Sequence, residues 1–285
     1  MITSLVKVGH IEWCQCKDPN TGEIFNLATP SSEKYLFQVT QLLKNEYQLR
    51  DRLTSDWAVK ACGQALYFGR YALLYPAFSY RTLVGLLDQP PAPLAIYLNN
   101  AIQLCAVVSC AHRQGIVHAD IKPANFFIFD DDSWRLRGFG LSSSGEATDE
   151  QPRPPAISGT LAYMSPEHTT RTTRQVTFQS DLYSLGIVLY ELLTGKLPFG
   201  APDGSLAEWV HHHIASEPVP HTLFGLMCQP WCQPLFSGCY LNHLSNAIRR
   251  LKAFRPISTG ACQQSLRRVR LSCLYPACRI RSRQG

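Results

Sequence analysis

Three polar residues between an apolar helix and a hairpin constrain the fold of this chain more than any other feature. They are Asp120, Lys122 and Asn125, and they lie within six residues of each other. Before them, apolar residues recur at helical spacing over 94–112. After them, two strand-like runs flank an acidic turn and predict a hairpin over 125–137. One tight loop can therefore hold the three side chains rigidly.

The three residue types suit phosphoryl transfer. That reaction needs a carboxylate to orient the attacking hydroxyl, a cation on the transferring phosphoryl group and a ligand for Mg²⁺. The run V-H-A-D-I-K-P-A-N resembles the catalytic loop of eukaryotic-type protein kinases, H-R-D-x-K-x-x-N, and its lysine is similar to that of the serine/threonine branch. The resemblance implies that Asp120 is the base, that Lys122 contacts the γ-phosphoryl group of ATP, and that Asn125 binds Mg²⁺. The alternative, a turn with scattered polar residues, is disfavoured because further matches follow in the family's order.

Two later stretches supply those matches. Residues 159–167 (GTLAYMSPE) resemble the kinase activation segment, which implies that Thr160 contacts Asp120 and Lys122, and that Glu167 pairs with an arginine from the last helices. Residues 181–186 (DLYSLG) resemble the start of the buried central helix of kinases, where the aspartate holds the backbone of the catalytic loop. An ordinary helix cap is the alternative for this aspartate, and the spacing of the matches favours the kinase interpretation.

The resemblance and the local patterns predict an α+β, two-lobed protein-kinase-like fold with an incomplete C-lobe. Residues 1–78 would form a degenerate N-lobe, with short strands before residue 40 and two more strands over 62–75. Between them, a helix carries Glu46 on the same face as three leucines. Residues 79–220 would form the C-lobe, with the catalytic loop, the activation segment and the central helix.

The parts of a kinase that hold metal and nucleotide depart from the family pattern. Gly138-Phe139-Gly140 stands where D-F-G is expected, and glycine has no side-chain oxygen for Mg²⁺. Residues 5–27 contain only Gly9 and Gly22, so a glycine-rich phosphate cover is missing.

The lysine that should pair with Glu46 is also unclear. A strand predicted over 35–39 places Gln38 at the lysine position, Lys34 is a second candidate, and Lys60 follows the helix and is in the wrong order. Glu46 itself is equally compatible with an ordinary helix residue. Ala119 stands where the family has an arginine that meets a phosphorylated activation loop, and alanine cannot make that pair.

One group of kinase-like domains fits these departures better than kinases at large. The body resembles the N-terminal kinase-like domain of bacterial multi-domain (hybrid) sensor histidine kinases, on the G-F-G, the A-Y-M-x-P-E stretch and the run W-V-H-H-H-I-A over 209–215. That resemblance implies downstream sensor and ATPase modules as partners. A metal site at the three consecutive histidines is disfavoured, because adjacent residues of a helix point in different directions.

The last 65 residues have a different composition from the rest. Residues 221–285 contain ten basic residues, six of the eleven cysteines and no acid, a net charge of +10 against −4 for residues 1–220. A nucleic-acid-binding arm, a weak zinc module at Cys228 and Cys232, a solvated basic segment and out-of-frame translation all remain open. Out-of-frame translation is favoured because the change falls at Pro220, in mid-domain. We expect that this segment does not pack as kinase helices.

Two functions from different classes follow. The first is ATP-dependent phosphorylation of serine or threonine in a protein substrate, with Mg²⁺ as cofactor. The alternative is a catalytically weak or silent regulatory module of a sensor protein, or a truncated fragment of one; the catalytic loop favours the enzyme, and Gly138 and Gln38 favour the silent module. The odd cysteine count and the absence of a secretory signal predict a cytoplasmic protein, and the absence of an apolar run of about 18 residues predicts no membrane span. Neither a membrane nor a nucleic acid is expected as a partner.

Overall fold

The computed structural model describes residues 5–18, 20–90, 92–144, 161–169, 175–200 and 205–216. Two sequence predictions lie outside these residues. They are the contacts of Thr160 and the packing of residues 221–285.

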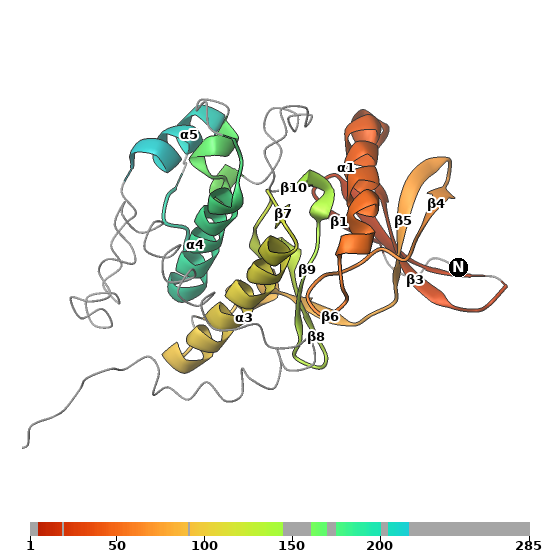
Figure 1. Ribbon diagram of the computed structural model, residues 1–285, viewed down its shortest axis with the longest axis horizontal. Coiled ribbons are helices and arrows are strands. Elements are labelled where there is room, and N and C mark those ends of the chain that lie inside the picture. Colours follow the sequence, from red (N-terminus) through yellow and green to blue (C-terminus); the bar gives the residue numbers. More distant parts are fainter. Residues whose placement is uncertain are drawn as a thin grey trace, which may run out of the picture. The chain divides into compact units, whose positions relative to one another are not determined.

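The N-terminal part is a five-stranded antiparallel sheet with one helix against it (Figure 1). The strands are β1 (Leu5–Val8), β2 (Ile11–Lys17), β3 (Ile24–Pro30), β4 (Gly63–Tyr67) and β5 (Arg70–Pro76), in the order β1-β2-β3-β5-β4. The helix α1 (Leu36–Leu49) follows a short 3-10 turn, η1 (Glu33–Tyr35), and precedes another, η2 (Arg50–Arg52). Its inward side chains Val39 and Leu43 share an apolar core with β3 and β5.

A second core lies among the helices that follow. These are α2 (Leu83–Leu87), α3 (Leu94–Arg113), α4 (Phe178–Thr194) and α5 (Leu206–Ala215). α3 and α4 pack side by side, and α4 is buried nearly all round, as its apolar sequence predicts. Of the helices in the described ranges, none combines the length and apolarity that a membrane span requires.

Two small sheets carry the loops of interest. β6 (Tyr80–Thr82), β8 (Phe126–Phe129) and β9 (Trp134–Leu136) form one sheet, and β7 (Ile116–Val117) pairs with β10 (Ser143–Ser144) in the other. The predicted hairpin is thus confirmed as β8 and β9. The remaining 3-10 turns lie beside the loops: η3 (Pro123–Asn125), η4 (Phe139–Leu141), η5 (Leu161–Tyr163) and η6 (Pro166–Thr169).

The two parts are joined by backbone hydrogen bonds. The segment after α1 runs beside β9: the Val59 amide donates to the Leu136 carbonyl at 2.8 Å, and the Leu136 amide donates to the Trp57 carbonyl at 2.8 Å. These hydrogen bonds connect the segment that follows α1, the helix of Glu46, to strand β9 of the hairpin that follows the catalytic loop.

The structure confirms the α+β class and corrects one strand. Residues 35–39, predicted as a strand with Gln38 at the lysine position, begin the helix α1, and Gln38 is exposed on it. The apolar spacing continues directly into the leucines of the helix, and this helical period outweighs the local strand propensity. The strand that precedes the helix is β3.

Candidate active site

The three side chains predicted to act together do meet in one loop. The Lys122 ammonium lies 2.7 Å from Asp120 Oδ2 and donates to Oδ1 at 3.0 Å. The Asn125 amide donates to Asp120 Oδ2 at 3.0 Å and to the Asp120 carbonyl at 2.8 Å. Asp120 and Lys122 keep 16% and 20% of their side chains exposed, so the carboxylate is positioned and still reachable.

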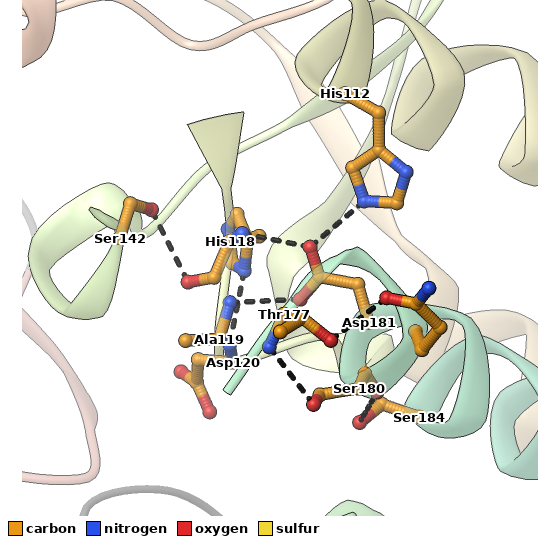
Figure 2. Close-up of polar contacts among 10 residues, drawn as sticks. His112, His118, Ala119, Asp120, Ser142, Thr177, Ser180, Asp181 and Ser184 are labelled. Carbon is orange, nitrogen blue, oxygen red and sulfur yellow. Dashed lines mark hydrogen bonds and ion pairs between the residues drawn. The ribbon is translucent and has the colours of Figure 1, made fainter. Parts of the chain in front are cut away.

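A buried carboxylate on α4 fixes the backbone of this loop. Asp181 Oδ2 accepts from the His118 amide at 2.7 Å and from His112 Nε2 at 2.9 Å, and Oδ1 accepts from the Ala119 amide at 2.8 Å. Figure 2 shows these donors converging on the one side chain. Asp181 is 1% exposed, so these donors, and not water, satisfy the carboxylate.

The helix cap is a separate device. Thr177 is the N-cap of α4, and it forms a reciprocal capping box with Ser180. Asp181 is therefore confirmed as the residue that holds the catalytic-loop backbone, and the alternative of an ordinary cap is wrong. The hydrogen bonds to Asp181 offset a strained backbone at Ala119. Its φ is +63°, a left-handed conformation that residues with a Cβ rarely adopt.

His118 is the inner support of the loop. It is fully buried, its Nδ1 accepts from the Asp120 amide at 3.2 Å, and its Nε2 lies 2.9 Å from the Arg137 carbonyl. Burial lowers the pKa of His118, and the two partners fit a neutral ring with the proton on Nε2. His112 and His118 were not predicted as site residues. His118 stands at the histidine of the H-R-D pattern, which was the available signal, whereas His112 lies in the apolar stripe of a helix that gives no indication of its partner.

The metal side of the site is incomplete. Gly138 has φ +83°, and a Cβ placed on it would lie 3.0 Å from Asn125 Oδ1, so the glycine stands directly beside that amide. Mg²⁺ takes a near-octahedral shell of oxygen ligands. One neutral amide oxygen, next to a carboxylate already paired with Lys122, does not make such a shell. Within the described residues, no cluster of three or more His, Cys, Asp or Glu side chains could hold a metal ion.

Glu46 is buried, 6% exposed, and the Tyr75 hydroxyl donates to its Oε1 at 2.8 Å. Burial raises the pKa of Glu46, and the Tyr75 hydroxyl, the charge of Arg137 and the Phe139 amide oppose that rise. No lysine or arginine of the described residues lies within 4 Å of this carboxylate. Glu46 is thus a core residue linked to the G-F-G turn.

No lysine candidate takes the expected place. Gln38 and Lys34 are both exposed, and the Lys34 ammonium lies over the Tyr35 ring. On β3, Ala28 pairs with Leu73 of β5, and residues two apart on a strand share a face, so Ala28 lies on the same face as Tyr75, which contacts Glu46. The strand therefore presents a fully buried methyl group on the face where a lysine would be needed.

Helix α1 is held directly against the G-F-G turn. The Asn45 amide donates to the Gly140 carbonyl at 2.8 Å and to the Ser142 carbonyl at 3.0 Å. A Cβ on Gly140 would lie 2.9 Å from Leu42 Cβ, so only glycine permits this approach. Asn45 was not predicted as a site residue. The only indication of its role in the sequence was that it is a polar residue next to Glu46.

The three consecutive histidines serve structural roles. His213 Nδ1 lies 2.8 Å from the Tyr183 hydroxyl and its Nε2 lies 2.8 Å from the Leu161 carbonyl, while His212 Nδ1 lies 2.8 Å from Ser216 Oγ. His211 is exposed. His212 and His213 thus have different partners, and His213 links α5 to Leu161.

Comparison with known proteins identifies the family. The protein kinase domain family matches residues 14–229. Serine/threonine-protein kinase A of Synechocystis sp. is 34% identical over 142 residues, 45% of this chain and 27% of the relative. Serine/threonine-protein kinase PknB of Mycolicibacterium smegmatis is 37% identical over 138 residues, 47% of this chain and 21% of the relative.

The chain thus spans about a quarter of the length of these curated relatives. Both are bacterial serine/threonine kinases by name, and protein kinases in general use ATP and a divalent metal. The family match covers well over half of the chain, and the five-stranded sheet, the catalytic loop and the buried aspartate agree with it. The chain belongs to the protein kinase domain family.

Proposed function

We propose that this chain transfers a phosphoryl group from ATP to a serine or threonine hydroxyl of a protein. The observation that supports it most directly is the contact of Asp120 with both Lys122 and Asn125, in a loop that Asp181 fixes. Asp120 is the residue that accepts the proton of the attacking hydroxyl. Lys122 is the cation that contacts the transferring phosphoryl group, since its ammonium lies 2.7 Å from the same carboxylate.

The charge of Lys122 has two uses in this proposal. Before substrate binds, the ammonium forms an ion pair with the Asp120 carboxylate. When a phosphoryl group approaches, the same ammonium can turn to it, and Asp120 then accepts the hydroxyl proton. Asn125 is the side chain that would hold a divalent metal through its Oδ1, and Thr160 is expected to contact Asp120 and Lys122 from the activation segment.

A second function is favoured by a specific observation. Gly138 provides no side-chain metal ligand, and the β3 residue on the same face as Tyr75, the partner of Glu46, is Ala28 and not a lysine. A kinase-like module that relays a signal without efficient turnover would retain the fixed loop and tolerate these changes. The resemblance to the kinase-like domain of hybrid sensor histidine kinases belongs with this alternative, with sensor and ATPase modules as partners and the cytoplasm as compartment.

The experiment that tests the first function is Asp120→Asn. This change keeps the shape of the side chain and removes the proton acceptor, so we expect transfer of radiolabelled phosphate to a serine peptide to fall by about 10²–10⁴-fold. Asp132→Asn is the matched control, because Asp132 is an exposed aspartate at the tip of the neighbouring hairpin. Equal activity of Asp120→Asn and the parent chain would show that Asp120 is not the base; no activity in either would favour the silent module.

We propose the domain bounds 1–78, 79–220 and 221–285, the last as a segment that is not part of the kinase fold. The test is limited proteolysis followed by mass spectrometry. Cleavage beyond residue 220 should precede cleavage within the body. Equal resistance of the two regions would argue against these bounds.

A further inference from the structure

Arg137 occupies a central place in the site that the sequence did not indicate. It lies between β9 and Gly138, its amide donates to the Asn125 carbonyl at 3.0 Å, and its Nε donates to the Ala124 carbonyl at 3.3 Å. The residue is only 6% exposed. A guanidinium is rarely buried so far, which calls for an account of what it contacts.

Two aromatic rings hold the guanidinium, one from each sheet. Its central carbon lies 4.8 Å from the ring centroid of Trp13 on β2 and 5.0 Å from that of Phe127 on β8. Further rings support both partners: Tyr75 lies 5.2 Å from Trp13, and Tyr80 stacks on Phe127 at 3.9 Å. A flat cation therefore fills a slot with aromatic walls between the five-stranded sheet and the hairpin of the catalytic loop.

The slot has the properties of a site for a planar ligand ring. Aromatic walls stack on flat π systems, and a purine is such a system. The indole N–H of Trp13 is buried without a hydrogen-bond partner among the described residues, so the slot also offers an unused donor. Asn125 and Gly138 lie directly beside Arg137 in the chain or in space, which places the slot next to the phosphoryl-transfer loop.

Two carboxyl groups lie near Arg137: Glu46 on α1 and Asp120 in the catalytic loop. Burial lowers the pKa of Arg137, and the charges of these two carboxyl groups oppose that change. These groups favour a charged guanidinium in the slot without forming a close ion pair with it. Arg137 is thus held by stacking on two rings, by the Nε hydrogen bond to the Ala124 carbonyl and by carboxyl groups that form no close ion pair with it, and a purine ring can replace the stacking.

We propose, on the basis of the proposed function, that Arg137 is an internal competitor for the base of the nucleotide. The side chain occupies the slot between Trp13 and Phe127, and a purine ring binds there only after the guanidinium has left. Arg137 then lowers the affinity of the chain for adenine compounds, so a variant without the guanidinium binds a nucleotide more tightly. If Arg137 instead contacts the phosphates, such a variant binds the nucleotide more weakly.

Adenosine and ATP together distinguish the two roles. Their affinities are measured by calorimetry, without added metal, for the parent chain, Arg137→Ala and Arg137→Gln. We expect both variants to bind adenosine and ATP about tenfold more tightly, the size of one lost stacking contact. If Arg137 instead contacts phosphate, ATP affinity will fall in both variants while adenosine affinity stays unchanged, and the proposal is wrong.

Arg135→Ala and Arg135→Gln are the matched controls. Arg135 lies on β9, two positions before Arg137, and its guanidinium lies over the Phe129 ring at 4.0 Å, whereas that of Arg137 lies over Trp13 and Phe127. The two Arg135 substitutions should leave adenosine affinity unchanged. A gain in adenosine affinity equal to that of the Arg137 variants would overturn the proposal. Thermal unfolding of each variant verifies that it is folded. Arg137→Gln covers the case in which Arg137→Ala fails to fold, because glutamine retains an uncharged N–H donor and more of the side chain than alanine does.

The peptide transfer assay separates this inference from the proposed function. If the Arg137 variants bind adenosine more tightly and no chain transfers phosphate, Arg137 is a competitor and the proposed kinase activity is wrong. If the parent chain transfers phosphate and the Arg137 variants bind adenosine as the parent does, the kinase activity stands and the role of Arg137 as a competitor is wrong. That role is also wrong if adenosine binds to none of the chains.

Discussion

The loop of Asp120 and the part of the site around Gly138 and Ala28 differ in how completely their side chains suit the proposed function. In the loop, Asp120, Lys122 and Asn125 contact each other, and Asp181 holds the backbone beneath them. In the other part, Gly138 offers no carboxylate and Ala28 offers no ammonium group. Under the proposed function, the half that would orient an acceptor hydroxyl is therefore complete, whereas the half that would bind ATP and metal is not.

The largest effect is expected from removing Asp181, the residue that holds the backbone of the catalytic loop. Asp181→Ala leaves two backbone amides and His112 without their acceptor inside the protein, and we expect a loss of about 3–5 kcal/mol in the free energy of unfolding. Urea denaturation measures it. Asp56→Ala, at an exposed aspartate, should cost little. Similar values for the two variants would mean that Asp181 does not anchor the loop.

A second change sharpens the comparison by restoring a metal ligand. Gly138→Asp adds a carboxylate beside Asn125 Oδ1, and we expect ATP affinity to gain several-fold from added Mg²⁺, whereas the parent chain gains little. Aspartate tolerates φ +83° better than most residues do. Calorimetry with and without Mg²⁺ measures the effect.

Gly138→Ala is the control for Gly138→Asp. It adds the same Cβ at the same strained φ without a carboxylate, so it should lose about 1–2 kcal/mol of stability and gain no dependence on Mg²⁺. Strong Mg²⁺-dependent binding by the unaltered chain would show that the metal site was misjudged.

The smallest expected effect is the pH dependence of the unfolding free energy, which arises from buried histidines. Burial lowers the pKa of His118, His168 and His213, so below about pH 6.5 the unfolded chain binds protons that the folded chain excludes. Stability is complete above that pH and falls as the pH drops through it towards the folded pKa values, by at most about 1.4 kcal/mol per pH unit for each histidine. Glu46, whose pKa burial raises, acts in the opposite direction at lower pH.

His213→Gln tests this pH dependence. It should make the dependence of the unfolding free energy on pH shallower between pH 7 and 5.5, because one of the three histidines no longer titrates. His211→Gln, at the exposed neighbour, should leave the slope unchanged. A slope that is equal in all three chains would contradict the assignment of a neutral His213.

The sequence predicted the elements with local signals. The period of α3, the apolar α4 and the hairpin at 126–136 were all expected, and so was the contact of Asp120 with Lys122 and Asn125, because these residues are close in sequence. The strand predicted over 35–39 was wrong, since the helical period that continues through Gln38 was overlooked.

Other features depend on packing and could not be predicted from local patterns. Asn45 and Arg137 have partners far away in the sequence, and their roles follow from how α1 and β9 are placed. The Tyr75 hydroxyl that contacts Glu46 likewise depends on the register of β5. A motif identifies residues that act through neighbours in the chain, and it gives no information about a side chain whose partners come from another element.

The bonds to Asp181 also bear on when the loop takes shape during folding. Each of them joins residues that are 62 to 69 positions apart, so none can form before α3 and α4 have packed together. The loop is thus expected to become ordered late, after the core that carries it. In native-state hydrogen exchange, the His118 and Ala119 amides would then be released only by openings that separate α4 from the loop, and their protection would report the cooperative stability of the whole C-terminal core.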